Sequence, residues 1–270
     1  MRVHRIYVPQ LSEQIDAQQI DAQQVDAGHV DVQIDASSTT ITLRGREAHH
    51  LVNVLRVQTG QAVRAFDGKG LEADGVVLTV GGGLGASVGD GVVLELSAPQ
   101  ASDIESNWHI HMAVGLLKGD KLADVVRQVT ELGAVSVQPF SSRFGDVPKA
   151  SPNKLSRWRR IAQEAAKQSG RSVVPQVHDP VKIGTLEPHD LGIIAHPYAS
   201  DHLTDVLTRH DLPEKATLTL VTGAEGGLAD QEIDHLIRKG FQVVSLGKRI
   251  LRAETAPMAL LSALLLPAGR

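Results

Sequence analysis

The sequence contains no cysteine, and this absence excludes several kinds of protein chemistry at once. A disulfide framework, a thiolate metal site and a cysteine nucleophile all require cysteine, so none of them can occur in this chain. No stretch approaches the roughly 18 to 20 uninterrupted apolar residues of a membrane span. The opening residues, "MRVHRIYV", also lack the apolar core of a signal peptide. We therefore expect a cytoplasmic protein that holds no metal and enters no membrane.

Two common glycine motifs of nucleotide-binding proteins are missing as well. The cluster "GGGLG" at 81–85 lacks the Gly-Lys-Ser/Thr ending of a phosphate-binding P-loop, which favours a flexible hairpin loop. No G-x-G-x-x-G follows an early strand, which argues against an oxidoreductase that binds a dinucleotide on a Rossmann sheet.

Positive charge is absent from one stretch of the chain and concentrated in another. Residues 11–36 hold six acids and no Lys or Arg, and apolar-acidic pairs such as Ile15-Asp16 and Ile20-Asp21 recur every five residues. A period of five fits neither a helix nor a strand, so this stretch is predicted to be an acidic low-complexity insertion in a loop. Residues 143–171, in contrast, hold eight cations against two acids. This basic stretch could contact phosphate, although a solvated helix face explains it equally well.

Short apolar runs separated by turn residues predict a small β-barrel or sandwich in the first third of the chain. The runs lie within 39–97, and Asp67-Gly68 and Asp74-Gly75 are the predicted turns between them. A short helix is predicted at 47–60, with one apolar face formed by Leu51, Val54 and Leu55.

After Pro99 the pattern changes to alternating strands and helices. This alternation predicts a mainly parallel sheet covered on both faces, and it places the domain boundary between 1–98 and 99–270. The predicted strands are at 108–117, 134–140, 191–197, 216–223 and 241–247. The predicted helices start at Asp120, Ser151, Asp230 and Glu254, with Ile233, Leu236 and Ile237 facing inward on the third.

Two loops follow predicted strands of this second domain, where ligands bind in open α/β sheets. The first, "VTGAEGGLADQE", has glycines that permit a close approach of the backbone and a carboxylate at Glu225. The second, "SLGKRILRAETA", offers Ile250 and Leu251 for a flat ring and the cations Arg249 and Arg252 for phosphate or a base carbonyl. Glu254 and Thr255 are also suited to cap the last helix, and capping is an equal explanation for them.

Several motifs in the same order resemble the RsmE family of ribosomal RNA small-subunit uridine-N3 methyltransferases, in the SPOUT superfamily. They extend over nearly the whole chain: "MRVHRIYV", "HHLVNVLRVQTGQAVRAFDGKG", "KGDKLADVVRQVTELG", "EAAKQSGRSVVPQV", "TGAEGG" and "LGKRILRAETA". The sequence departs from the family pattern at Ala224 and Lys248, where prolines are usual, and in the acidic insertion at 11–36.

The resemblance implies a fold, a cofactor and a partner. It implies a PUA-like RNA-binding β-barrel at 1–98 and, at 99–270, a SPOUT domain whose C-terminal trefoil knot binds S-adenosylmethionine. The implied reaction is methylation of N3 of a uridine in 16S ribosomal RNA or the small subunit, by a homodimer. The apolar run "MALLSALLL" would fit the dimer interface, although a core helix explains it equally well.

The resemblance also implies roles for individual residues. Arg252 and Arg249 are the catalytic candidates, and no histidine among His49, His50 and His196 stands out as a general base. The cofactor-binding candidates are Thr222, Gly223, Glu225, Gly226, Gly227, Leu246, Gly247, Ile250, Leu251 and Thr255. The RNA-binding candidates are Arg5, His50, Arg56, Arg143 and Arg171.

Two alternatives remain open at this point. The protein could be a SPOUT methyltransferase that acts on transfer RNA or on a ribose 2′-hydroxyl, or it could be an RNA-binding protein without catalysis. The intact Glu225, Arg252 and Glu254-Thr255 argue against the second alternative. A methyltransferase should be stabilised against heat by S-adenosylmethionine and not by NAD.

Overall fold

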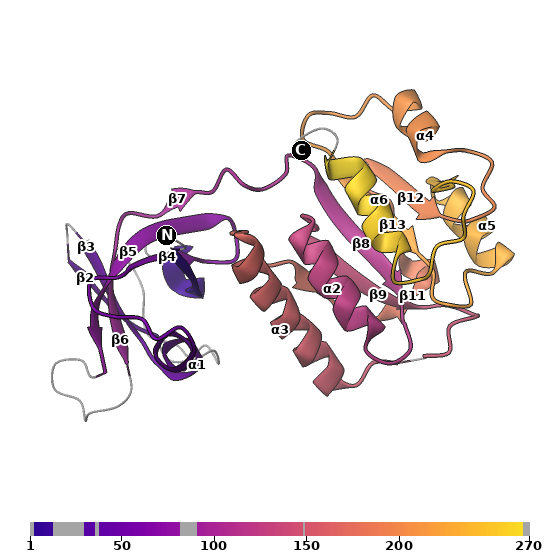
Figure 1. Cartoon of the computed structure of the whole chain (residues 1–270). Coiled ribbons are helices and arrows are strands. Elements are labelled where there is room, and N and C mark those ends of the chain that lie inside the picture. Colours follow the sequence, from indigo (N-terminus) through magenta and orange to yellow (C-terminus); the bar gives the residue numbers. More distant parts are fainter. Residues whose placement is uncertain (1–2, 13–29, 36–37, 82–90, 148, 267–270) are drawn as a thin grey trace. The chain divides into compact units, whose positions relative to one another are not determined.

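The computed structural model describes residues 3–12, 30–35, 38–81, 91–147 and 149–266 (Figure 1). The chain divides into two compact units. Unit 1 comprises Met1–Ile104 with Gly170–Val173, and unit 2 comprises Glu105–Ser169 with Val174–Arg270. The division lies beyond the predicted limit at residue 98 because a short strand, β7 (Gln100–Ala101), still pairs with a strand of unit 1.

Unit 1 is built on a mostly antiparallel sheet in the order β1-β4-β5-β6-β3-β2. Its strands are β1 (His4–Tyr7), β2 (Val30–Asp35), β3 (Ser38–Leu43), β4 (Ala62–Phe66), β5 (Leu71–Val80) and β6 (Val92–Leu96). Among the described strands of this sheet, only β1 and β4 pair in parallel. Apolar side chains that alternate along the strands fill one core, which includes Ile6, Ile41, Leu43, Val63, Val77 and Leu94.

The predicted turn at Asp67-Gly68 is confirmed. The carboxylate of Asp67 accepts hydrogen bonds from the backbone N–H groups of Lys69 and Leu71, at 2.7 and 3.0 Å. The predicted turn at Asp74-Gly75 is wrong, because both residues lie inside β5. Gly75 is required there for packing, since a Cβ would lie 2.4 Å from a methyl group of Leu96.

The predicted helix at 47–60 is shorter and changes type. Helix α1 (Gly45–His49) continues into a π-helix, η2 (His50–Val54). The wider π turn rotates the following side chains, so Leu51 is buried but Val54 is 61% exposed. The prediction that Val54 faces inward is therefore wrong.

The acidic stretch at 11–36 is only partly described. Pro9–Ser12 forms a 3-10 helix, and Val30–Asp35 forms strand β2, which pairs with β3 in antiparallel register. The prediction of a loop insertion therefore fails for 30–35, while 13–29 and most of the glycine cluster at 81–85 lie outside the described residues.

The segment Gly170–Val173 is tied into unit 1 by a buried polar cluster. Arg5 donates to Glu72 at 3.2 Å and to the hydroxyl of Ser172 at 2.9 Å, and that hydroxyl donates to Glu72 at 2.8 Å. Arg5 also donates to the backbone carbonyl of Arg171 at 3.1 Å. The guanidinium of Arg5 lies 5.1 Å from the ring centre of Phe66. These contacts neutralise a carboxylate inside the unit.

Unit 2 contains the predicted parallel sheet, in the order β10-β9-β8-β13-β12-β14, with β11 beside β9. All of its paired strands are parallel. They are β8 (His109–Gly115), β9 (Ser136–Ser141), β10 (Gln176–Val177), β11 (Val181–Lys182), β12 (Leu191–Ala195), β13 (Thr217–Thr222) and β14 (Phe241–Val244). The short strands β10 and β11 were not predicted.

Helices cover both faces of this sheet (Figure 1). They are α2 (Lys121–Glu131), α3 (Pro152–Ser169), α4 (Leu203–Arg209), α5 (Asp230–Arg238) and α6 (Ala256–Leu265). Residues of α2, α3, α4 and α6 share one core with Ile110, Met112 and Leu220, while α5 packs with Ala113 and Val221 on the other face. No described helix is long and apolar enough to cross a membrane.

Some details of the helices differ from the sequence predictions. Helix α4 was not predicted, and Ile237, expected to face inward on α5, is 47% exposed. Asp120 and Thr255 occupy the N-cap positions of α2 and α6, but neither side chain caps its helix. The carboxylate of Asp120 pairs instead with Arg157, at 2.6 Å.

Histidines meet at the amino-terminal end of the sheet and make the stability of unit 2 sensitive to acid. The rings of His111 and His189 stack with centres 4.4 Å apart, and His111 bonds to Ser136 at 2.7 Å. Burial, followed by the nearby positive charges of His189 and other histidines, lowers the pKa of His111 from 6.5 to about 4. The folded state therefore favours the neutral ring of His111. The contribution of this ring to the stability of the folded state is complete above pH 6.5, and it is lost as the pH falls toward 4 because the unfolded chain then takes up the proton more readily.

We expect wild-type protein to lose about 1 kcal/mol of stability at this site between pH 7 and pH 5, after allowing for solvent screening of the half-buried ring. Urea unfolding at both pH values measures this loss. His111→Asn, which cannot titrate, should lose correspondingly less over the same interval. Equal losses in the two proteins would contradict the assignment.

Candidate active site

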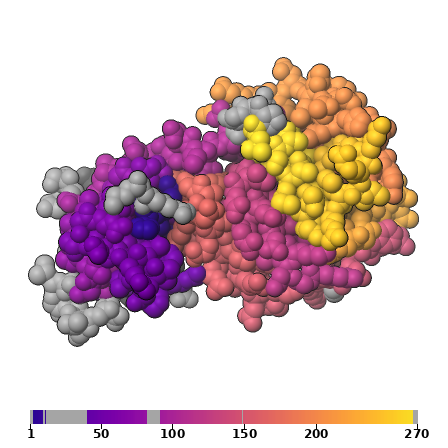
Figure 2. Space-filling view, viewed as in Figure 1, coloured from indigo at the N-terminus to yellow at the C-terminus, as the bar shows by residue number. Residues whose placement is uncertain are grey.

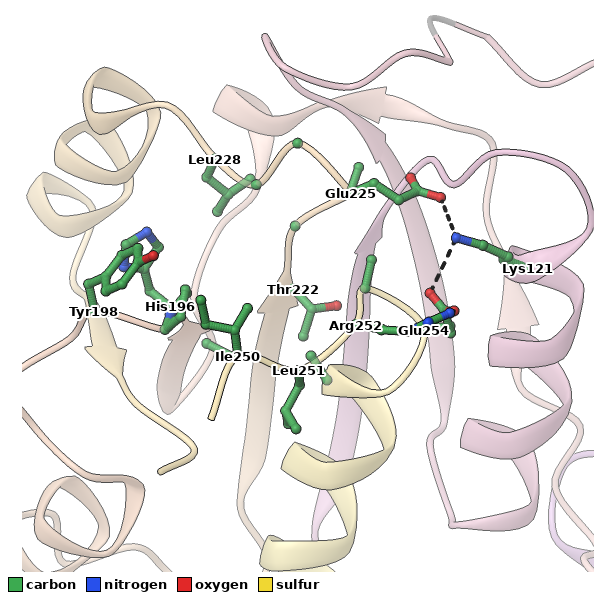
Figure 3. Close-up of a pocket in the computed structure, with 18 of the residues that line it drawn as sticks. Lys121, His196, Tyr198, Thr222, Glu225, Leu228, Ile250, Leu251, Arg252 and Glu254 are labelled. Atoms are coloured by element: carbon green, nitrogen blue, oxygen red, sulfur yellow. Dashed lines mark hydrogen bonds and ion pairs between the residues drawn. The ribbon is translucent and has the colours of Figure 1, made fainter. Parts of the chain in front are cut away.

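The main cavity of unit 2 opens where β12 and β13 end, at the carboxyl edge of the parallel sheet (Figure 3). Its volume is about 770 Å³. Most of its lining comes from three segments: 195–198 from the end of β12, 222–228 from the end of β13, and 250–254 with Ala256 around the start of α6. Lys121 and Asp230 complete it. Parallel strands expose free backbone groups at this edge, which is where the two predicted ligand loops converge.

The glycine loop after β13 is packed too closely for most side chains. A Cβ on Gly226 would lie 2.3 Å from the carbonyl oxygen of Phe144, and one on Gly115 would lie 2.4 Å from the backbone N of Ala224. Gly227 adopts a φ of +74°, which favours glycine. Ala224, in the same loop, is buried. The backbone of this loop therefore has a fixed path along the cavity.

Lys121, at the start of α2, joins the two predicted loops through their carboxylates (Figure 3). Its Nζ lies 3.0 Å from Oε1 of Glu225 and 3.5 Å from Oε2 of Glu254. Glu225 also accepts from the backbone N–H of Lys118 at 3.3 Å. Burial would raise the pKa of Glu225, but hydrogen bonds from backbone N–H groups and from Lys121 outweigh it and lower that pKa. Glu225 is therefore held as a carboxylate at neutral pH.

The two catalytic candidates lie in different cavities. Arg252 lines the main cavity, and its side chain is 85% exposed. Its one ion pair among the described residues is with Glu254, at 4.0 Å. Arg249 lines a smaller adjoining cavity of about 50 Å³, together with His196 and Leu246. Arg252 is thus free to reach a ligand in the main cavity.

The side of the cavity opposite Lys121 is apolar and aromatic (Figure 3). His196 and Tyr198 follow β12, and their ring centres lie 5.9 Å apart in an edge-on arrangement. Tyr198 is 78% exposed and Ile250 is 68% exposed, so both are accessible at the mouth. The cavity therefore combines an apolar and aromatic wall with the cations Lys121 and Arg252.

Two family models match this chain. The model of an RNA methyltransferase domain matches residues 104–265, and that of an RNA methyltransferase PUA domain matches residues 43–83. Ribosomal RNA small subunit methyltransferase E of Synechocystis sp. is 39% identical over 235 residues, which cover 83% of this chain and 72% of the relative. The chain belongs to the ribosomal RNA small subunit methyltransferase E family.

A second relative and a solved crystal structure of this family are also similar to this chain. The Bacillus subtilis protein of the same name is 32% identical over 246 residues, which cover 83% of this chain and 89% of that protein. A crystal structure of the Neisseria gonorrhoeae protein, bound to S-adenosyl methionine, matches with a TM-score of 0.78 and 26% identity. The match covers 98% of each chain, so the similarity extends over both units.

Most of the cofactor-binding candidates line the main cavity. Those that do are Thr222, Gly223, Glu225, Gly226, Gly227, Ile250 and Leu251. Leu246 lines the smaller cavity, while Gly247 and Thr255 line neither. Gly247 instead provides a positive φ of +102° in the loop after β14.

Several residues of the cavity were not predicted from the sequence, and Lys121 is the clearest of them. It belongs to the "KGDK" motif that supported the family resemblance, but its distance in sequence from both loops concealed the contact. Tyr198, Leu228 and Asp230 also line the cavity. No motif marked Tyr198, since it follows the predicted strand 191–197 as an ordinary loop residue.

The RNA-binding candidates have different surroundings. Arg5 and Arg171 are largely buried within unit 1, and this burial weighs against a direct contact with RNA. His50 is half-buried, and Arg56 and Arg143 are exposed. Arg56 has a φ of +52°, unusual for a residue other than glycine. Within the described ranges, no group of His, Asp and Glu side chains has the arrangement of a metal site.

Proposed function

We propose that this protein transfers a methyl group from S-adenosylmethionine to N3 of a uridine in 16S ribosomal RNA of the small subunit. Membership of the RsmE family and the name of its relatives support the substrate. The observation that carries the proposal is the cavity of about 770 Å³, which combines glycine-lined backbone, apolar walls and an accessible Arg252 in one place.

The residues of the cavity fit S-adenosylmethionine. The hydroxyl of Thr222 is buried and has no hydrogen-bond partner among the described residues, so it can bond to a polar ligand at no further desolvation cost. Ile250, Leu251 and Leu228 offer apolar contacts for an adenine ring, and the backbone of the glycine loop offers donors and acceptors. The carboxylates of Glu225 and Glu254 compensate part of the positive charge of the cofactor.

The chain's own residues then have to orient the target base and stabilise its charge. The cofactor supplies a methyl group on a positively charged sulfur, which is already activated for transfer. N3 of uridine lies between two carbonyl groups, and the negative charge that develops when it loses its proton spreads onto their oxygens. Arg252 lines the cavity and would place its guanidinium against that charge, and Arg249 would assist from the adjoining cavity.

The proposal also includes the knotted fold, the two domains and the cellular location that the family resemblance implies. The C-terminal part of 99–270 forms a trefoil knot, as the resemblance to the family implies. Unit 1 forms the RNA-binding PUA-like domain and unit 2 the methyltransferase domain of a cytoplasmic protein.

A homodimer completes the proposed assembly. Leu260, Leu261, Leu264 and Leu265 of α6 are buried in the core of unit 2, which explains much of the apolar run. The adjoining Leu266 is 66% exposed, and Figure 2 shows the C-terminal segment in yellow at the surface of this unit. This exposed edge is where a second copy would pack.

The test is methyl transfer from labelled S-adenosylmethionine to small ribosomal subunits that lack the modification. Nucleoside digestion and mass analysis identify the product. We expect labelled N3-methyluridine. Label in a different nucleoside, or no label in a protein that still binds S-adenosylmethionine, would contradict the assignment and point to transfer RNA as the next substrate to examine.

The hydroxyl of Thr222 provides a prediction about cofactor binding. We expect Thr222→Val to weaken S-adenosylmethionine binding by about 1 kcal/mol, or about fivefold, because one hydrogen bond to the ligand is lost. The free protein should be no less stable, since the hydroxyl has no partner in it. Titration calorimetry and thermal unfolding measure the two effects, with Thr222→Ser as the control that keeps the hydroxyl. Unchanged affinity in the valine variant would contradict this contact.

A further inference from the structure

A second cavity lies in unit 2, at the carboxyl ends of β9 and β11 and beside α5. Its volume is about 540 Å³. Its walls come from three segments: 141–143 after β9, 182–184 after β11, and the outer side of α5 from Gln231 to Arg238. None of its lining residues belongs to the main cavity.

Three exposed cations line this second cavity: Arg143, Lys182 and Arg238. None of them takes part in an ion pair among the described residues. Arg143 donates to the side chain of Gln231 at 3.2 Å, and Arg238 donates to the carbonyl of Asp234 at 3.2 Å. Both are neutral acceptors, so the positive charges are not neutralised by these contacts.

The only carboxylate in the lining, Glu232, is occupied by backbone groups. Its two oxygens accept from the N–H of Arg143 at 2.8 Å and from the N–H of Ala229 at 2.9 Å. His235 lines the same wall and donates from Nε2 to the carbonyl of Gly184 at 3.1 Å. The cavity therefore presents an excess of positive charge that is fixed to a rigid helix and two strand ends.

A hydroxyl donor lies beside these cations. The Oγ atom of Ser142 is buried and has no hydrogen-bond partner among the described residues. A cavity that combines three uncompensated cations with an unused hydroxyl has the chemistry of a phosphate site, because phosphate oxygens accept from both kinds of donor.

The linings of the two cavities include consecutive residues at the first turn of α5. Asp230 lines the main cavity, and the next two residues, Gln231 and Glu232, line the second one. The glycine loop also connects them, since Gly226 packs against Phe144, the neighbour of Arg143. A polynucleotide whose target base enters the main cavity would thus carry its adjacent backbone toward the second.

We propose that the second cavity binds the phosphate backbone of the substrate RNA next to the methylated uridine, through Lys182, Arg238 and Arg143. This inference rests on the proposed function, because it places the RNA chain relative to the methyl-transfer cavity. The site fixes the position of the strand and carries no sequence information, as is usual for phosphate contacts.

The test compares a double variant, Lys182→Gln with Arg238→Gln, with the wild type. Each phosphate contact that is lost should make RNA binding less dependent on salt. The slope of log KM for small ribosomal subunits against log salt concentration should therefore fall by about 1.5 when both cations are removed. At moderate salt the KM should rise about tenfold. The kcat at saturating substrate and the Kd for S-adenosylmethionine should stay at the wild-type values.

Two further variants make the outcome specific. Lys182→Arg with Arg238→Lys keeps both charges and should retain most of the affinity for RNA. Lys215→Gln with Arg127→Gln removes two exposed cations of unit 2 that line neither cavity, and should leave the salt slope unchanged.

A wild-type KM and slope in the Lys182/Arg238 double variant would overturn the proposal while leaving methyl transfer intact. A raised KM with an unchanged salt slope would also overturn it, because the effect would then not be electrostatic. Failure of the wild-type protein to methylate the subunits would instead refute the proposed function itself.

Discussion

Replacing Arg252 with alanine should lower kcat for methyl transfer by about 100-fold or more, because the enzyme would lose the cation proposed to stabilise the uridine anion. The side chain is 85% exposed and its nearest carboxylate, Glu254, is 4.0 Å away. The substitution should therefore change the stability of the folded protein very little. The Kd for S-adenosylmethionine and the melting temperature should therefore remain close to wild type. Single-turnover methylation of small subunits measures the chemical step directly.

Lys248→Ala is the matched control for this prediction. Lys248 is an exposed cation of the same loop, and it lines neither the main cavity nor the smaller one. A rise in pH should recover the Arg252→Ala rate more than the wild-type rate, because hydroxide then removes the N3 proton. Equal kcat values for Arg252→Ala and Lys248→Ala would show that Arg252 has no part in the chemistry.

The order of most elements in unit 2 was predictable from sequence because the longer strands are rich in apolar residues and most helices have one apolar face. Strands β8, β12, β13 and β14 and four of the five helices agree with the predictions, and β9 extends one residue beyond its predicted range. The errors have local causes. The dipeptide Asp74-Gly75 resembles a turn, but the glycine is needed inside β5 for contact with Leu96, a residue distant in sequence. Short strands such as β10 and β11 are defined by their partner β9 and carry almost no pattern of their own.

The candidate site was predictable where it consists of loops and not where it depends on contacts between them. The loops 222–227 and 250–252 could be identified from their glycines, their cations and their position after strands. Arg5 and Arg171 are cations typical of RNA-binding surfaces, yet both are largely buried within unit 1, where the guanidinium of Arg5 pairs with Glu72. Lys121 shows the opposite error, since it was assigned no role and lies between two carboxylates of the cavity.

Lys121 is a positioning residue whose replacement should be rescued by a second mutation. Its ammonium group forms an ion pair with the carboxylate of Glu254 at 3.5 Å. Arg252 is the other cation within 4.0 Å of that carboxylate. Without Lys121, Glu254 is left to pair with Arg252 and draws it away from the substrate. We expect Lys121→Met to lower kcat by about five- to thirtyfold, which corresponds to a coupling of about 1 to 2 kcal/mol.

The double variant Lys121→Met with Glu254→Gln separates this mechanism from a general loss of structure. Because glutamine carries no charge, Arg252 is released and most of the lost kcat should return. Lys121→Met with Glu225→Gln should not recover, since no ion pair between Glu225 and Arg252 occurs among the described residues. Lys121→Arg, which keeps the charge, should stay near wild type. If Glu254→Gln gives no recovery, Lys121 acts only through the packing of α2 against the loops, and the competition between Lys121 and Arg252 for Glu254 is refuted.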